Sequence, residues 1–306
     1  MFILAYIHFF RNMIHTIEPA DFGSFQLYTI EAGRFLLDGG AMFGVVPKTL
    51  WSKYIPADEN NRIQMAMRSL LIKSKISGKI YLVDTGSGDK FNAKMANIYG
   101  LDYNHSHLLR SLETVGITPE EITDIIFTHL HFDHCGGTTA YDSDGHLTEV
   151  FPNANYHVNK RHWQTATHPN EREKASFFPE NLDPIQKSGR LILSENQHRY
   201  EPGLSSFCVD GHTEGQQLPM IQAGNKTLVY AADLIPTYAH IPLPWIMGYD
   251  MVPVQTLKEK EVFLENAIAG NWYLFLEHDS SHEIVTVKKE NGKFSMKDSL
   301  SLADIT

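Results

Sequence analysis

Three histidines and an aspartate occupy residues 129–134 of the chain, in the order HLHFDH. Imidazole nitrogens and carboxylate oxygens are common protein ligands of divalent transition metals. The preceding residues 122–127 are rich in apolar and β-branched side chains, which predicts a buried strand that ends just before this segment. Alternate side chains of an extended chain point the same way, so we expect His129, His131 and Asp133 on one side. The spacing therefore predicts a metal site at a strand end.

The alternative to a metal site is a polar cluster that satisfies its own hydrogen bonds. Burying unpaired imidazoles and a carboxylate would cost on the order of several kcal/mol of desolvation. His134 departs from the strand alternation, and Gly136 and Gly137 allow the backbone to turn tightly after it. Four such side chains crowded at a strand end have no advantage for packing, so the pattern favours a metal site.

Later in the chain, three more ligand-type side chains each follow an apolar, strand-like stretch: His212, Asp233 and His278. A single histidine or aspartate after a strand is usually a turn residue. Here a ligand-type side chain follows an apolar stretch three more times in a chain that already carries the histidine-rich segment. We therefore expect all three side chains to reach the same site. Asp84 also ends an apolar stretch, and we expect it either to orient a ligand or to cap the following turn.

Composition places the chain among ordinary globular proteins. It has 306 residues, of which 42% are hydrophobic and 20% charged, enough for a sizeable core. No Pro-, Gly- or Ser-rich linker divides it, so we expect an apolar arm at residues 1–22 and one domain over residues 23–306. The net charge is −10 and lysine and arginine do not cluster, so neither a nucleic acid nor an anionic membrane is an expected partner.

The first ten residues, MFILAYIHFF, are apolar but too few to span a membrane. They are a poor signal peptide, because no cationic segment precedes them and no small-residue cleavage site follows. We expect an arm that packs on the domain or on a second subunit, which leaves a homodimer open; the alternative is a natural start at Met13. Cys135 and Cys208 cannot build a disulfide framework, so the expected location is the cytoplasm.

Apolar periodicity predicts a mixed α/β order for the rest of the chain. The expected strands are residues 25–32, 68–74, 79–83, 154–158, 206–209, 227–232 and 272–276, with a final hairpin at 283–288 and 293–296. The expected helices are residues 105–115, 160–167 and 257–269, with a further polar helical stretch at 170–189. Residues 37–44 and 235–253 fit neither period and are expected to form loops.

Both loop regions carry more apolar side chains than a solvated loop needs. The candidates for an apolar pocket wall are Met42, Phe43, Trp51, Leu243, Trp245, Tyr249 and Met251. Such a wall would bind the apolar part of a small molecule. The alternative is that the first loop simply folds onto the core.

The segment HLHFDH resembles the metallo-β-lactamase superfamily, whose signature HxHxDH is matched by His129, His131, Asp133 and His134. The resemblance covers the chain from about residue 25 to the final hairpin. It implies an α/β (α+β) fold, an αβ/βα four-layer sandwich of two mixed sheets flanked by helices, with metals at one edge between the sheets.

The resemblance also implies a ligand set for two ions. One metal would take His129, His131 and His212, the second would take Asp133, His134 and His278, and Asp233 would bridge them. Two Zn²⁺ per chain are the expected cofactors, because imidazole suits zinc, although iron, manganese or cobalt would fit the same nitrogen and oxygen ligands.

Within the superfamily, the blocks ITPEEITDIIFTHLHFDHCGG, FPNANYHV, DGHTEGQ and AADLIPTYAH are similar to those of N-acyl homoserine lactonases and their organophosphorus-hydrolysing relatives. One departure concerns catalysis: well-known lactonases place a tyrosine three residues after the bridging aspartate, where this chain has Pro236. Tyr238 and His240 are the nearest candidates for its substrate-polarising role. The alternative is that both only satisfy backbone groups in a buried loop.

The lactonase resemblance implies opening of the ring of a lactone that carries an apolar tail. A metal-bridging hydroxide would attack the carbonyl, and Asp133 would shuttle a proton to the leaving ring oxygen. Two alternatives stay open: a phosphotriesterase or aryl-esterase on the same dinuclear centre, and a non-catalytic metal-binding protein.

Overall fold

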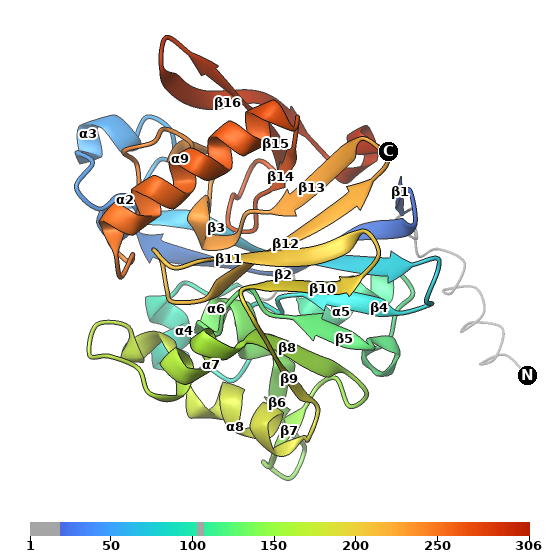
Figure 1. Ribbon diagram of the computed structural model, residues 1–306. Helices are drawn as coiled ribbons and strands as arrows, with labels where there is room; N and C mark the ends of the chain where they lie inside the picture. The colour runs from blue at the N-terminus through green and yellow to red at the C-terminus, as the bar shows by residue number, and fades with distance from the viewer. Residues whose placement is uncertain (1–18, 103–106) are drawn as a thin grey trace, which may run out of the picture.

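In the computed structural model, which describes residues 19–102 and 107–306, two seven-stranded mixed sheets pack face to face with helices outside them (Figure 1). The first sheet, in spatial order, contains β1 (Ala20–Phe22), β2 (Phe25–Asp38), β3 (Arg62–Ser74), β4 (Ile80–Val83), β5 (Asp124–Ile126), β8 (Asn155–Asn159) and β9 (Leu191–Ser194). The second contains β10 (Gln197–Glu201), β11 (Leu204–Val209), β12 (Gln216–Ala223), β13 (Lys226–Tyr230), β14 (Tyr273–Phe275), β15 (Ile284–Glu290) and β16 (Lys293–Leu300). These two sheets and their helices confirm the predicted αβ/βα sandwich.

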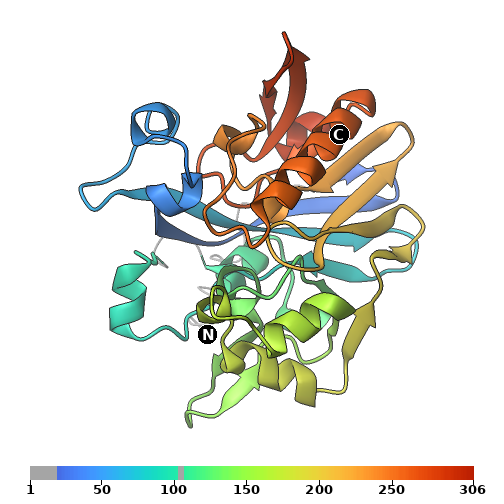
Figure 2. The ribbon, with the colours of Figure 1, turned by 60° about the vertical axis from the view of Figure 1, so that its left-hand side comes forward.

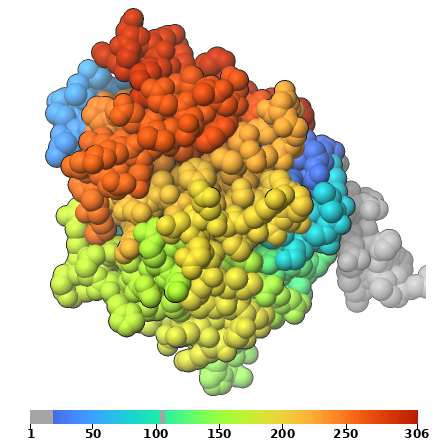
Figure 3. All heavy atoms as spheres, in the orientation of Figure 1, coloured from blue at the N-terminus to red at the C-terminus, as the bar shows by residue number. Residues whose placement is uncertain are grey.

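The helices and a small hairpin cover the outer faces. The helices are α2 (Gly39–Phe43), α3 (Lys48–Trp51), α4 (Ala93–Ile98), α5 (Leu108–Thr114), α6 (Phe132–Cys135), α7 (Lys160–Thr167), α8 (Pro179–Lys187) and α9 (Pro253–Ala269). The hairpin pairs β6 (Thr139–Tyr141) with β7 (Leu147–Glu149). Helix α9 lies on the outer side of the second sheet (Figure 1), and the orange atoms of this part of the chain adjoin the yellow atoms of that sheet on the surface (Figure 3). Within the described residues no helix has the length and apolarity to cross a membrane.

Alternate residues of the inner strands face two different cores. In β4, Tyr81 and Val83 pack between the two sheets, whereas Ile80 and Leu82 pack under the helices of the first sheet. The whole of β4 is buried, as expected for a strand covered on both faces. These two cores fix the register of the sheets, since a shift of one residue would exchange their faces.

The edge that carries the ligands is where each sheet contains parallel strands. In the first sheet β5 runs parallel to β4 and β8, and in the second β13 runs parallel to β14. The carboxyl ends of parallel strands meet at one edge of a sheet. Asp84 follows β4, Asp233 lies just beyond β13, and His278 just beyond β14, so all three arrive at this edge.

Several predicted elements differ from the structure. Residues 39–43 are helical rather than a loop, because the Asp38 side chain caps them by accepting from the Ala41 amide. Residues 20–22, predicted as part of the arm, form a strand that pairs with β2; the rest of that arm, residues 1–18, lies outside the described residues. Figure 2 shows the blue α2–α3 segment above the teal α4 on one side of the molecule.

Candidate metal centre

The segment that carries the signature is positioned by Asp84 at the end of β4. Its two carboxylate oxygens accept from the Thr128 amide at 2.7 Å and the Thr128 hydroxyl at 2.6 Å. Asp84 itself has a φ of 56°, an uncommon conformation for a residue other than glycine. Asp84 thus holds the first turn after β5. Of the two roles that the sequence left open for Asp84, orienting a ligand and capping a turn, this contact matches the first.

The predicted alternation continues only part of the way. His131 is extended, with φ −62° and ψ 154°, but α6 then begins at Phe132. A helical turn, rather than a strand, therefore aims Asp133 and His134. Gly136 serves close packing rather than a left-handed turn, since a Cβ there would lie 2.2 Å from the Ser87 carbonyl oxygen.

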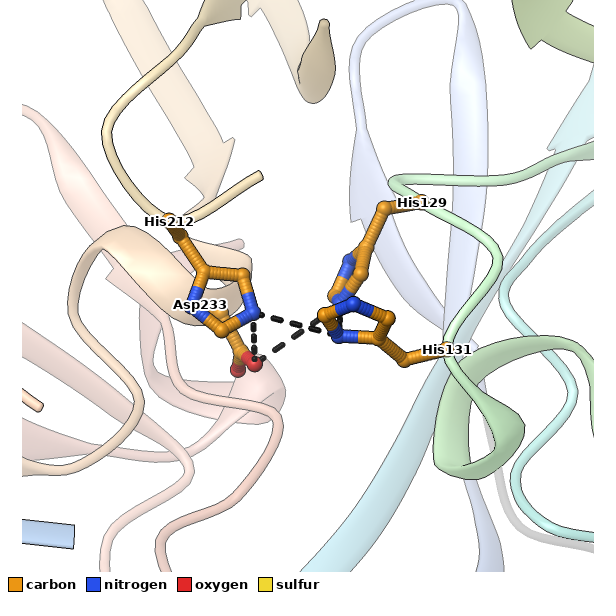
Figure 4. A group of neighbouring side chains, drawn as sticks. All are labelled: His129, His131, His212 and Asp233. Atoms are coloured by element: carbon orange, nitrogen blue, oxygen red, sulfur yellow. Dashed lines mark hydrogen bonds and ion pairs between the residues drawn. The ribbon is translucent and has the colours of Figure 1, made fainter. Parts of the chain in front are cut away.

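Four of the predicted ligands form a first cluster between the two halves of the molecule (Figure 4). His129 Nε2 lies 2.9 Å from His131 Nδ1, and His212 Nε2 lies 3.3 Å from the same His131 atom. Asp233 Oδ2 completes the group at 3.1 Å from His212 Nε2. His129 and His131 come from one side of this gap and His212 and Asp233 from the other.

The remaining three predicted ligands, Asp133, His134 and His278, form a second cluster beside the first. His278 Nε2 lies 3.1 Å from His134 Nε2 and 3.7 Å from Asp133 Oδ2. Asp233 faces both clusters, because its Oδ1 is 3.1 Å from His278 Nε2 while its Oδ2 faces His212. All seven side chains are buried, and this position of Asp233 is the one that a bridging ligand needs.

Most of the histidines are fixed by a partner on their outer nitrogen. His212 Nδ1 lies 3.0 Å from Asp250 Oδ1, and His278 Nδ1 lies 2.8 Å from the Ala66 carbonyl oxygen. The Nδ1 atom of His134 lies 3.0 Å from Asp84 Oδ2 and 3.1 Å from Glu277 Oε2. Such outer partners fix the tautomer and orientation of metal-binding histidines.

The electrostatics of the bare side chains are in conflict. Burial alone would lower the pKa of His212 and His278. Asp233, together with Asp250 beside His212 and Glu277 beside His278, outweighs burial and raises these pKa values to about 10 and about 9. Burial and the neighbouring His212 lower the pKa of His131 to about 3. Inward-facing imidazole nitrogens lie 2.9–3.3 Å apart, and only one nitrogen of each facing pair can carry the hydrogen between them. One divalent cation in each cluster would satisfy every inward atom, so the residues fit a pair of ions.

A cavity of about 320 Å³ opens directly over these clusters. Of the predicted wall residues, Met42, Tyr249 and Met251 line it together with the ligands His131, Asp133, His212, Asp233 and His278. The wall also includes residues that sequence reasoning missed: Leu37, Tyr99, Phe132, Arg172, Glu173 and Met247. Tertiary packing brings these residues to the cavity, and no periodic pattern in the sequence marks them. Met247 alone of them lies in the loop at residues 235–253, which was expected to supply an apolar wall.

Four predicted wall residues do not line this cavity: Phe43, Trp51, Leu243 and Trp245. Phe43 and Trp51 stack on each other in the core, with ring centroids 5.1 Å apart. The loop that carries Leu243 and Trp245 is bound to α9, because the buried Lys260 ammonium donates to both of their carbonyl oxygens. For Phe43 and Trp51, the alternative that this region folds onto the core agrees with the structure.

Tyr238 and His240, the sequence candidates for the substrate-polarising donor, also lie outside the cavity wall. The Tyr238 hydroxyl donates to the Tyr54 carbonyl oxygen at 2.9 Å. His240 is buried, with Nδ1 2.7 Å from the Thr237 hydroxyl and Nε2 2.9 Å from the Met42 carbonyl oxygen. Both side chains satisfy loop groups, as in the alternative that the sequence left open.

We expect Tyr238→Phe to leave kcat within about twofold of the unmodified protein, because its hydroxyl contacts the loop and not the cavity. His240→Ala should instead destabilise the fold by roughly 1–3 kcal/mol, since it leaves buried partners unpaired. Thermal unfolding and kcat measured on the same metal-loaded samples check this. A loss of tenfold or more in kcat for Tyr238→Phe, with metal retained, would contradict the placement.

Metal removal offers a second check on the clusters. A cation that binds only the folded chain at 1,000 times its Kd adds about 4 kcal/mol to stability. We therefore expect a chelator to lower the melting temperature clearly and added zinc to restore it. Scanning calorimetry measures the melting temperature in each state. A melting temperature that does not respond to either treatment would speak against ion binding by these residues.

Comparison with known proteins agrees with this site. A sequence profile of the metallo-beta-lactamase superfamily matches residues 68–278. The chain is 30% identical over 206 residues to an N-acyl homoserine lactonase of a Bacillus species, an alignment that covers 64% of this chain and 70% of that protein. The chain belongs to the metallo-beta-lactamase superfamily, a family of metal-dependent hydrolases.

Two solved structures show the same fold over nearly their whole length. A probable metal-dependent hydrolase from Staphylococcus aureus superposes with a TM-score of 0.81 at 30% identity, covering 92% of this chain and 100% of that one. AidC, a dizinc quorum-quenching lactonase solved with its product N-hexanoyl-L-homoserine, superposes with a TM-score of 0.74 at 23% identity, covering 93% and 98%.

Proposed function

We propose that this protein opens the lactone ring of N-acyl homoserine lactones at a centre of two divalent cations, with zinc as the first candidate. The observation that carries the proposal is the convergence of seven histidine and aspartate side chains, five of which line a cavity with both polar and apolar walls. The curated relative at 30% identity is an N-acyl homoserine lactonase, which supports the substrate class.

The cavity has a polar wall at the clusters for the lactone ring and an apolar wall beside them for the acyl tail. When bound, two divalent cations supply Lewis acidity and lower the pKa of water for attack on a carbonyl. Leu37, Met42 and Met247 provide apolar wall for an acyl tail beside the clusters. Tyr99 and Tyr249 also line the cavity and are the phenol donors available to a substrate in place of Tyr238.

Asp133 is the group we assign to proton transfer. It belongs to the second cluster and also lines the cavity, so its carboxylate faces both the ligands and the substrate space. Its Oδ2 lies 3.7 Å from His278 Nε2 and 3.9 Å from His134 Nε2. A carboxylate at this place can hold the proton that the leaving ring oxygen needs.

The test is a substrate panel on the metal-loaded protein, with homoserine lactones of different tails, paraoxon-type phosphotriesters and aryl esters. We expect ring-opened acyl homoserine, one water heavier than the lactone, in mass spectrometry. Faster turnover of the phosphotriesters or aryl esters than of the lactones would favour the alternative function, a phosphotriesterase or aryl-esterase. Release of the free fatty acid would show amide cleavage and overturn the proposed reaction.

A further inference from the structure

The turn at residues 170–176 carries a buried acid that the metal ligand set does not include. Glu173 is only 3% exposed, and a carboxylate is seldom so deeply buried unless it is paired. Its Oε1 accepts from the Asn170 amide at 2.7 Å and its Oε2 accepts from the Thr213 hydroxyl at 2.9 Å. Two neutral donors hold the carboxylate in place, and no lysine or arginine forms an ion pair with it in the described part of the chain.

His131 is the one cluster histidine that turns Nδ1 inward; the inward atom of the other four is Nε2. Its outward Nε2 is buried and has no hydrogen-bond partner among the described residues. Glu173 Oε2 faces this nitrogen at 3.8 Å, beyond hydrogen-bond distance. His131 therefore differs from its neighbours, whose outward nitrogens have a partner within 3.1 Å.

We propose that Glu173 is the positioning residue of His131, and that it accepts the Nε2 hydrogen of this imidazole once a cation takes Nδ1. The role rests on the proposed metal centre. A neutral imidazole that ligates through one nitrogen carries its hydrogen on the other, and an acceptor there fixes the ring. The gap from 3.8 Å to a hydrogen bond is less than 1 Å, within reach of a small rotation of the ring.

The same turn also contacts the ligand from the opposite half of the molecule. Thr213, which donates to Glu173, directly follows His212 in the chain. Arg172 donates to the carbonyl oxygen of Gly248 and lies 3.5 Å from that of Asp250, whose carboxylate binds His212 Nδ1. The turn at residues 170–176 thus faces His131 through Glu173 and contacts the neighbours of His212, Thr213 and Asp250, from the cavity wall.

Three variants test this role: Glu173→Ala, Glu173→Gln and, as a matched control on the same turn, Glu171→Gln. Glu171 is 89% exposed and, among the described residues, forms an ion pair only with Lys174, so its loss should change nothing at the centre. Chelator competition measures the affinity for each zinc ion, and the visible spectrum of the cobalt-substituted protein reports ligand geometry. Circular dichroism and melting of the metal-free forms check folding.

We expect Glu173→Ala to weaken one of the two ions by about 10–100-fold and to change the cobalt spectrum. Glu173→Gln should lie between this and the unmodified protein, because an amide oxygen still accepts a hydrogen bond. If Glu173→Ala does not fold, the zinc affinity and the cobalt spectrum of Glu173→Gln alone test the role. Unchanged affinity and spectrum in the folded variants would overturn the role while leaving the proposed function intact. An unmodified chain that binds no ion would overturn both.

Discussion

Asp233→Ala should bind neither ion tightly and should lose hydrolysis to below detection. Its two oxygens face His212 in one cluster and His278 in the other, both at 3.1 Å, so one substitution removes the shared carboxylate from both sites. Asp233→Asn, which keeps the size of the side chain, should have the same direction of effect. Elemental analysis after gel filtration, with protein concentration measured independently, gives the ion count per chain.

Asp183 on α8 provides the control for Asp233, because it is an exposed aspartate whose one ion pair within residues 19–102 and 107–306 is with Lys187. Asp183→Ala should keep the ion count and the activity of the unmodified protein. Two ions retained in Asp233→Ala would remove the bridging assignment, even if activity were lost.

Asp133→Asn is expected to separate metal binding from turnover. The amide oxygen can still approach an ion, but the side chain can no longer hold the transferred proton, and such proton transfer contributes about 10²–10⁴-fold to rate. We expect kcat to fall by that range while at least half of the metal is retained. Elemental analysis and kcat must be measured on one preparation.

For Asp133→Asn, kcat divided by the metal content per chain separates a role in proton transfer from a role in metal binding alone. Loss of both ions together with activity would make Asp133 a ligand only. Retention of metal with full activity would place the proton shuttle on another group.

The ligand set was the part of the site that sequence could predict best. His129, His131 and His134 stand so close in sequence that few folds could separate them, and His212 and His278 lie where apolar stretches end. The structure brings all of these together with the two aspartates. How they arrive was less predictable, since a helical turn replaces the expected strand alternation after His131.

The walls of the cavity depend on tertiary packing and were predicted poorly. Tyr99 and Arg172 reach the cavity from segments whose own sequence carries no metal-binding pattern. Residues 238–240 were expected to lie in a loop, with Tyr238 and His240 as candidate donors to a substrate. They form a 3₁₀ turn instead, and His240 turns into the core.

The fold class was predictable because its central strands are continuous apolar runs. Two of the strands that were missed are less apolar: β10 reads QHRYE, and β12 contains three glutamines and Pro219. They form at the start of the second sheet, where strand pairing with β11 fixes them rather than their own composition. Local pattern is a weak guide for such strands.

Titration of zinc into chelator-treated protein, with lactone ring opening followed at each addition, tests the central claim most directly. The claim is that the seven converging side chains form a dinuclear hydrolytic centre. We predict no turnover in the metal-free protein and a rise that levels off at two zinc ions per chain. Full turnover without added metal, under a chelator that has removed every ion, would contradict it, as would no turnover of any lactone with two zinc ions bound.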